Sequence, residues 1–387
     1  MSMALTAGRQ TRAAVRTAHY DPWLLAGTLA LLALGLVMVF SASISISERA
    51  TGGSGHFLVR HAAAVGLGLL AMAAVTRLPL RLWEAAGPWL LLAGVGLLAI
   101  VLIPGVGLHV NGSSRWLPLG FATLQPSELA KLFMVIYVAG YLIRRQEELK
   151  SFTTGILMIG IVVAVVGMLL LQEPDLGAVV VICVTVLAML FLGGVRFWHF
   201  MVVVGAGAGG MALLTIFYPY RLARVTGFLD PWADPFDTGF QLTQALIAFG
   251  RGEWFGVGLG GSIQKLFYLP AAHTDFVFAV LAEELGLIGT LGVIALFGIL
   301  VWRAFVISRH AERLGHLYAA RLAQGLGVLL GVQALINMGV NMGALPTKGL
   351  TLPFVSYGGS SMLACCIAVG LLLRVGYESR RQRVGAS

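Results

Sequence analysis

The chain has 387 residues, of which 58% are hydrophobic and only 11% are charged, and its mean hydropathy is +0.89. Soluble domains carry charge on about a quarter of their residues, so this composition excludes an ordinary soluble protein and indicates an integral membrane protein. The formal net charge of +9 lies in short loops between apolar runs, which is typical of membrane topology and not of a nucleic-acid-binding face.

Apolar runs recur along the chain, and we count about ten that could span a bilayer, because a spanning helix needs roughly 20 mostly apolar residues. No soluble stretch is long enough to build a second core. We therefore predict an all-α, polytopic membrane protein with one ten-helix domain over residues 22–374, between an N-terminal tail (1–21) and a C-terminal tail (375–387). The predicted spans cover residues 22–43, 58–76, 86–104, 126–143, 153–172, 175–193, 197–217, 275–302, 317–343 and 353–374.

Lys and Arg are more frequent in the loops that share a side with the N-terminus, and positive loops stay in the cytoplasm. Both tails are therefore predicted to be cytoplasmic, and the long loop 218–274 to be periplasmic. The first run has no convincing signal-peptidase site and is expected to remain as a helix. The cysteines lie inside apolar runs, so we expect neither a disulfide framework nor a zinc site.

Glycines inside two of the spans are expected to let helices pack closely, because small residues allow close approach in lipid. They are Gly205, Gly207, Gly209 and Gly210 in the seventh span, and Gly325, Gly327 and Gly331 in the ninth.

The loop between the third and fourth spans carries the first polar motif. Asn111-Gly112 predicts a turn, and Pro126 fits the first turn of a helix capped near Gln125. Arg115, followed by Trp116, fits an anchor at the membrane interface.

Two charged residues then enter the fourth span, which makes it the weakest of the predicted spans. Glu128 and Lys131 are spaced i and i+3, so they share one helix face and would offset each other's desolvation if buried. A polar pair inside a membrane is either a structural ion pair or part of a functional site, and both interpretations stay open.

Short acidic motifs follow in two loops. Pro174 breaks the chain between the fifth and sixth spans, and Asp175 is expected to cap the helix that follows. Asp230, Asp234 and Asp237 can hold Mg²⁺ that bridges substrate phosphates, although prolines after two of them favour turns. A divalent cation therefore stays an alternative, with no cofactor and no metal ligand assigned.

Asp275 stands where the long loop becomes a span. On a helix it would share a face with Ala279, Ala282 and Gly286, a small-residue face that could line a cavity, while Glu283 would point elsewhere. A carboxylate at the mouth of a spanning helix can act as a general base, but Asp at a helix start is also a favoured N-cap. Physical reasoning alone leaves the two roles balanced.

The last external turn holds a lone lysine between prolines, Lys348, followed by a Gly- and Ser-rich stretch that includes Ser356. A fixed ammonium group there suits an anionic phosphate, although a solvated lysine is the usual alternative. The small residues that follow tolerate close approach of a ligand or a helix.

Several of these motifs together resemble the shape, elongation, division and sporulation family of bacterial membrane proteins, and within it the division type. They are NGSSRWLPLGFATLQPSELAKL, QEPDLG, the block from DPWADPFDTGFQ to HTDFVFAVLAEELG, and NMGALPTKGLTLPFVSYGGSS. The resemblance implies a ten-helix peptidoglycan glycosyltransferase in the inner membrane, at the division septum, that polymerises lipid II on the outer side. It also implies a partner, a class B penicillin-binding protein that acts as transpeptidase.

The resemblance assigns roles to particular residues. Asp275 matches the essential catalytic carboxylate, Glu128 and Lys131 match a polar pair, and Lys348 matches the lysine of the PTKG turn. We expect Arg115, Glu128, Lys131, Lys348 and Ser356 to bind substrate, with the cations stabilising the diphosphate leaving group.

Two other functions stay open. A lipid II flippase would use the same intramembrane polar residues as a path, but its inverted repeats should appear as matching broken helices, and none is apparent. A scaffold without activity that holds a transpeptidase in place is the other alternative.

Overall fold

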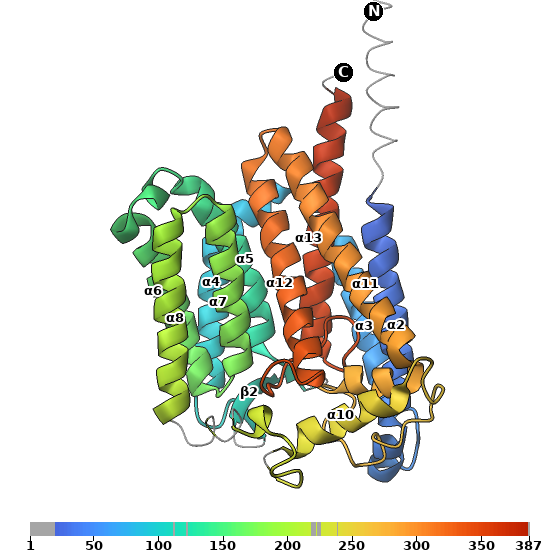
Figure 1. Cartoon of the computed structure of the whole chain (residues 1–387). Helices are drawn as coiled ribbons and strands as arrows, with labels where there is room; N and C mark the ends of the chain where they lie inside the picture. Colours follow the sequence, from blue (N-terminus) through green and yellow to red (C-terminus); the bar gives the residue numbers. More distant parts are fainter. Residues whose placement is uncertain are drawn as a thin grey trace, which may run out of the picture.

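The computed structural model describes residues 20–110, 113–120, 123–217, 222, 226–237 and 239–385. Ten long helices form a bundle (Figure 1). They are α2 (Pro22–Thr51), α3 (His56–Val75), α4 (Leu80–Val101), α5 (Pro126–Arg144), α6 (Leu157–Gln172), α7 (Leu176–Leu192), α8 (Phe197–Phe217), α11 (Val277–Arg313), α12 (Leu317–Asn341) and α13 (Gly359–Gly385). A 3₁₀ turn, Glu148–Lys150, and a π-helical turn, Phe152–Ile156, precede α6.

These helices correspond one for one to the predicted spans. Nine of the described helices are long and apolar enough to cross a membrane, counting α6 together with the π-helical turn before it. The tenth, α7, is apolar but has only 17 residues. The protein is therefore an all-α, multi-pass membrane protein, as the composition predicts.

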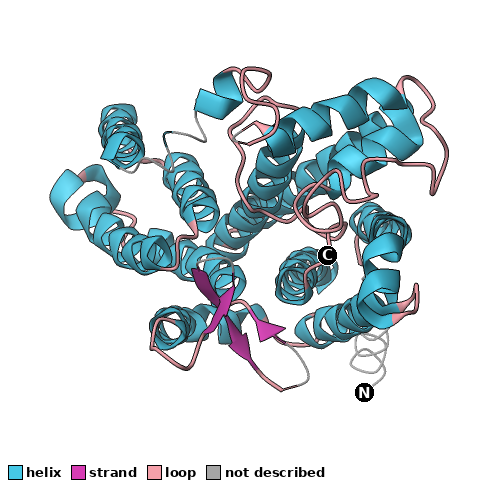
Figure 2. Cartoon of the chain, turned by 90° about the horizontal axis from the view of Figure 1, so that it is seen from below, coloured by secondary structure: helices cyan, strands magenta, loops and turns pink. Residues whose placement is uncertain are grey.

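Short elements gather at one end of the bundle, opposite the end where α2 begins and α13 finishes (Figure 1). They are β1 (Leu108–Val110), β2 (Ser113–Pro118), β3 (Thr123–Leu124) and α10 (Phe240–Gly252). The strands form an antiparallel sheet in the order β1-β2-β3, with Val110 paired to Ser113 and Leu117 to Leu124 (Figure 2). The predicted turn Asn111-Gly112 lies outside the described residues, but the paired strands flank it.

Helix α12 lies in the interior of the bundle and packs against α11, α5 and α7. The predicted close packing is confirmed on this helix: side-chain carbons placed on Gly325 and Gly327 would lie 2.6 Å from Met189 Sδ and 2.7 Å from Ala304 Cβ. The same prediction is wrong for α8, because carbons placed on its glycines would meet nothing within 4 Å. The α8 glycines therefore face no neighbouring helix within the described chain.

Helix α11 is broken at Gly286, where φ is 65° and ψ is −163°. These angles are incompatible with an α-helix. The loop after α10 satisfies the exposed backbone groups, as Val257 N donates to Glu283 O at 3.0 Å and Leu287 N to Glu253 O at 2.9 Å. A side chain at Gly286 would meet this loop, because Phe255 N lies 2.7 Å from the position of its first carbon. Glycine is therefore required at the break by both conformation and space.

Helix boundaries differ from the predicted spans at several ends: α2 continues to Thr51, α4 begins at Leu80, and α11 continues to Arg313. Helix α13 begins at Gly359, after an irregular stretch that was predicted as helix from residue 353, and it continues to Gly385 through the region predicted as a tail. Near this end, Arg380 and Arg303 both bind Asp21, the N-cap of α2. The end of α13 is therefore fastened to the rest of the bundle.

Candidate active site

Asp275 lies in the turn that precedes α11 and is half-buried. The helix begins at Val277, and its N-cap is Phe276 rather than Asp275. The face predicted from Asp275 to Gly286 is wrong at both ends, because Asp275 precedes the helix and Gly286 breaks it. The sequence left two roles open for Asp275, the N-cap of α11 and a general base. Asp275 is not the N-cap, because Phe276 takes that position.

Arg115, on β2, reaches the turn between α6 and α7. Its Nε donates to Glu173 O at 3.0 Å, and its Nη2 donates to Pro174 O. A side-chain carbon placed on Gly349 would lie 3.2 Å from Asp275 Oδ2 and 4.0 Å from Arg115 Nη1. The carboxylate and the guanidinium group therefore both lie beside the same glycine.

Lys348 precedes that glycine, in the turn between α12 and α13. Its ammonium group has no hydrogen-bond or ion-pair partner within the described residues. Burial lowers the pKa of the Lys348 ammonium group below its usual value. An anion that entered beside Gly349 would therefore come near a cation that no described residue neutralises.

Glu128 and Lys131 form the buried ion pair that their spacing predicts. Lys131 Nζ lies 2.8 Å from Glu128 Oε1 and donates to Gln333 Oε1 at 2.8 Å. Lys131 is only 2% exposed, and Gln333 Nε2 donates to Thr351 O at 3.2 Å. The pair is therefore joined through Gln333 to the chain just after the Lys348 turn.

Ser356 is buried and its hydroxyl is used inside the protein. Ser356 Oγ donates to Thr274 O at 2.6 Å and accepts from Leu352 N at 2.8 Å. These bonds fix the stretch before α13 against the residue next to Asp275. Substrate binding by Ser356 stays a prediction.

The other acidic residues have local structural contacts. Asp175 caps α7, as predicted, by accepting from Ala178 N at 3.1 Å. Asp230 Oδ1 accepts from Ala233 N at 3.2 Å. This bond agrees with the interpretation that Asp230 belongs to a turn. Within the described residues, no group of three or more His, Cys, Asp or Glu side chains is placed to hold a metal ion.

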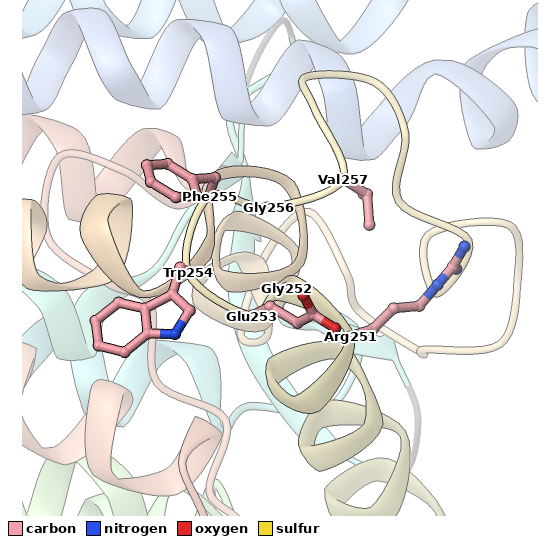
Figure 3. Close-up of a pocket in the computed structure, with 7 residues that line it drawn as sticks. All are labelled: Arg251, Gly252, Glu253, Trp254, Phe255, Gly256 and Val257. Carbon is pink, nitrogen blue, oxygen red and sulfur yellow. The ribbon is translucent and has the colours of Figure 1, made fainter.

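A cavity of about 420 Å³ lies along the loop after α10, lined by Arg251 to Val257 (Figure 3). The rings of Trp254 and Phe255 project to one side of this loop and Arg251 to the other. None of the predicted site residues lines this cavity, so it is separate from the cluster around Gly349.

Three neighbours of the cluster were not singled out from the sequence. Glu173 is fully buried, and neither of its carboxyl oxygens has a hydrogen-bond partner in the described part of the chain. Asn337 and Asn341, on α12, contact the backbone of Asp275. Buried amides repeated at i and i+4 in an apolar span were the signal that could have found the asparagines.

Comparison with known proteins places this arrangement in a family. Residues 22–381 match the FtsW/RodA/SpoVE family model, described as a cell cycle protein. The chain belongs to this family. The probable peptidoglycan glycosyltransferase FtsW of Nitrosococcus halophilus is 56% identical over 376 residues, 97% of each chain. The probable peptidoglycan glycosyltransferase FtsW of Coxiella burnetii is 53% identical over 360 residues, 93% of this chain and 97% of that one.

Solved structures of family members share the fold. A chain from a peptidoglycan synthase complex that coordinates polymerization and crosslinking is 32% identical, with a TM-score of 0.78 over 93% of this chain and 98% of that one. The rod shape determining protein RodA of Thermus thermophilus is 30% identical, with a TM-score of 0.65 over 92% and 96% of the two chains. This chain therefore has the same overall fold as these structures.

Proposed function

We propose that this member of the FtsW/RodA/SpoVE family is a peptidoglycan glycosyltransferase that polymerises lipid II into glycan strands during septal wall synthesis. The near full-length identity to relatives named as probable peptidoglycan glycosyltransferases supports the reaction class. The observation that carries the proposal is that a half-buried carboxylate, Asp275, and the guanidinium group of Arg115 both lie beside Gly349. Lys348, the residue before this glycine, has no ion-pair partner within the described residues.

In the proposed reaction, the terminal sugar 4-hydroxyl of one lipid II gives its proton to Asp275. The oxygen forms a bond to the anomeric carbon of a glycan held on undecaprenyl diphosphate, while the bond from that carbon to the diphosphate oxygen breaks. The diphosphate leaves with the electron pair. Because it needs charge stabilisation rather than a proton, one carboxylate suffices as the only acid-base group.

The cations in the cluster have separate proposed parts. Lys348 is available to the diphosphate because no described residue neutralises it. Arg115 is held by two backbone carbonyls, which fixes its direction without forming an ion pair to a described acid. Lys131 is already paired with Glu128, so we propose that this pair binds substrate less directly and shapes the floor of the site.

Location and partners complete the proposal. We propose that the end of the bundle with β1–β3 and α10 faces the periplasm, that both termini are cytoplasmic, and that the protein acts at the septum. The partner is a class B penicillin-binding protein that cross-links the new strand. The likeness to a chain of a synthase complex that couples polymerization and crosslinking supports such a partner.

The central experiment is Asp275→Asn, assayed with labelled lipid II in detergent together with the transpeptidase partner. Removing a general base costs about 10²–10⁴-fold in rate, so glycan polymer should disappear while the complex still assembles. Asp230→Asn, an exposed carboxylate of the same loop, is the matched control and should polymerise normally. Normal polymer from Asp275→Asn would overturn the catalytic assignment.

The same protein reconstituted in liposomes tests the flippase alternative. Transport of lipid II without polymer formation would favour a flippase. A complex with the partner that assembles but forms no polymer, even with the wild-type protein, would favour a scaffold.

A further inference from the structure

Three amide side chains follow one another along α12 at intervals of four residues: Gln333, Asn337 and Asn341. Residues four apart lie on the same helix face. All three are at most 2% exposed, inside a helix that is apolar enough to span a membrane. Buried amides are costly unless their donors and acceptors are satisfied, so their partners show what the series does.

Two of the amides share one partner, the backbone carbonyl of Asp275. Asn337 Nδ2 and Asn341 Nδ2 each donate to Asp275 O at 2.9 Å. A carbonyl oxygen has two lone pairs, and here each is used by a different side chain. The two bonds fix the plane of the peptide that links Asp275 to Phe276, and with it the origin of the Asp275 side chain.

The same side chains hold the elements on both sides of Asp275. Asn341 Oδ1 accepts from Ala279 N at 3.0 Å, in the first turn of α11. Asn337 Nδ2 also donates to Leu350 O, next to Gly349. One face of α12 therefore sets the distance between the start of α11 and the Lys348 turn.

Gln333 continues this arrangement one helical turn further, through its bonds to Lys131 Nζ and Thr351 O. One helix, α12, thus forms hydrogen bonds to the buried ion pair, to the chain around the Lys348 turn and to the Asp275 peptide. A catalytic group built on such a support is held more accurately than one on a free loop.

We propose that Asn337 and Asn341 are positioning residues that orient Asp275 for proton abstraction, through the backbone carbonyl that they share. The inference rests on the proposed function, because it takes Asp275 to be the general base. Neither asparagine touches substrate. They fix the geometry of the carboxylate. Their loss should therefore lower the rate of the chemical step and leave substrate affinity unchanged.

The test compares Asn337→Leu, Asn341→Leu and the double variant in the lipid II polymerisation assay with the transpeptidase partner present. Each single variant leaves the Asp275 carbonyl with one donor, so we expect kcat to fall by less than about 10-fold. The double variant loses both donors and should fall by about 100-fold, with KM within about 2-fold of the wild-type value.

The matched control is Gln324→Leu, which removes a buried amide from the opposite end of the same helix. Gln324 accepts from Arg321 Nη1 at 3.0 Å and makes no contact with Asp275. A structural role of buried amides would lower thermal stability in both cases, whereas a positioning role lowers kcat only in the asparagine variants. A double variant whose kcat equals that of Gln324→Leu, or whose loss lies wholly in KM, overturns the inference.

Hydrogen exchange gives a readout that does not depend on activity. Backbone amides between residues 271 and 280 should exchange faster in the double variant than in the wild type. In Gln324→Leu their exchange rates should equal those of the wild type. Equal rates in the two variants would count against positioning. If the double leucine variant does not assemble, Asn337→Ser with Asn341→Ser keeps a short polar group there and is judged by the same outcomes.

The result for Asp275→Asn separates the two proposals. An active Asp275→Asn would end the proposed function itself, whatever the asparagine variants do. An inactive Asp275→Asn beside a fully active double variant would overturn only the positioning inference.

Discussion

Two clusters of charged residues lie at the two ends of the first segment of α11, one at the Gly286 break and the other at Asp275 and the Gly349 turn. They differ in how their charges are balanced. At the Gly286 break, Glu284 accepts from Lys265 Nζ at 2.7 Å and from Ser41 Oγ at 2.6 Å, and Glu283 accepts from Arg251 at 3.0 Å. At the Gly349 turn, Lys348 is half-buried and has no such partner within the described residues.

The difference separates charges that hold the structure from charges that are available to a ligand. Lys265 is 5% exposed and its charge is cancelled, so it fastens the loop after α10 to α2 and α11. Lys348 bears the cost of partial burial without a compensating acid among the described residues, an arrangement that folding alone does not favour. An anionic substrate group would supply the missing partner.

The largest expected effect is at the first cluster. Lys265→Met leaves Glu284 as an uncompensated buried charge, which should cost about 3–5 kcal/mol of stability. The measurement is thermal unfolding of the purified protein in detergent. Lys265→Met with Glu284→Gln should regain most of this loss, because the stranded charge is gone.

The exposed pair of Arg145 and Glu148 provides the control for that loss. Their side chains are 48% and 37% exposed, so Arg145→Met should change the unfolding temperature little. Equal losses in Lys265→Met and Arg145→Met would show that the buried pair has no special structural role.

The second cluster should respond in the opposite way. Lys348→Met removes a cation whose burial costs stability, and it leaves no described acid without its partner. The unfolding temperature should therefore stay unchanged or rise, while polymerisation falls by about 100-fold, as for loss of one charge-stabilising group. The comparison of the two lysines fails if Lys348→Met unfolds as readily as Lys265→Met, or if it polymerises normally.

The lowered pKa of Lys348 predicts a pH dependence. The ammonium group must be protonated to balance a diphosphate, so kcat/KM should decline as the pH rises through its lowered pKa. In Lys348→Arg the decline should move to higher pH, because guanidinium stays charged. If kcat/KM declines at the same alkaline pH in both proteins, the decline reports the titration of another group.

The folded state also binds this proton less tightly than the unfolded state does. Between the lowered pKa and the usual value of 10.5, the unfolded chain therefore holds more protons, and the contribution of Lys348 to stability rises with pH. Activity and stability should thus change in opposite directions over this window, which unfolding at high pH would not produce.

The spans were predictable because each is a long apolar run whose character does not depend on its neighbours. Helix α5 shows the limit: Glu128 and Lys131 weakened its prediction, yet they lie buried because Gln333, from a helix far along the chain, completes their hydrogen bonds. Charge inside a span is interpretable only when its tertiary partners are known.

The sequence indicated candidate site residues, whose roles stay predictions, but it did not indicate how they are arranged in space. Asp275, Arg115 and Lys348 come from three separate segments of the chain. Nothing local to these segments indicates that Asp275 and Arg115 lie beside Gly349, the residue after Lys348. The same holds for the break at Gly286, where the partner loop lies about thirty residues earlier and replaces the helical hydrogen bonds. The strands are too short, two to six residues, for a periodic pattern to identify.

The smallest expected effect is at Glu173, beside Arg115, and it extends the comparison to a third kind of charge. Burial, together with the nearby charge of Asp175, raises the pKa of Glu173 from 4.5 to about 8, although Arg115 opposes the shift. The carboxyl group is therefore mostly neutral at pH 7, neither paired like Glu284 nor available like Lys348. Glu173→Gln should accordingly polymerise at the wild-type rate at pH 7.

The pH dependence of stability distinguishes this neutral state from an ionised one. Between pH 4.5 and about 8 the folded wild type holds a proton that the unfolded chain releases, so its stability falls as the pH rises across this range. Glu173→Gln lacks that fall and should unfold at a higher temperature than the wild type at pH 8, with little difference at pH 4.5. A variant that keeps its fold but loses polymerisation at pH 7 would instead show that the Glu173 carboxyl group takes part in the reaction.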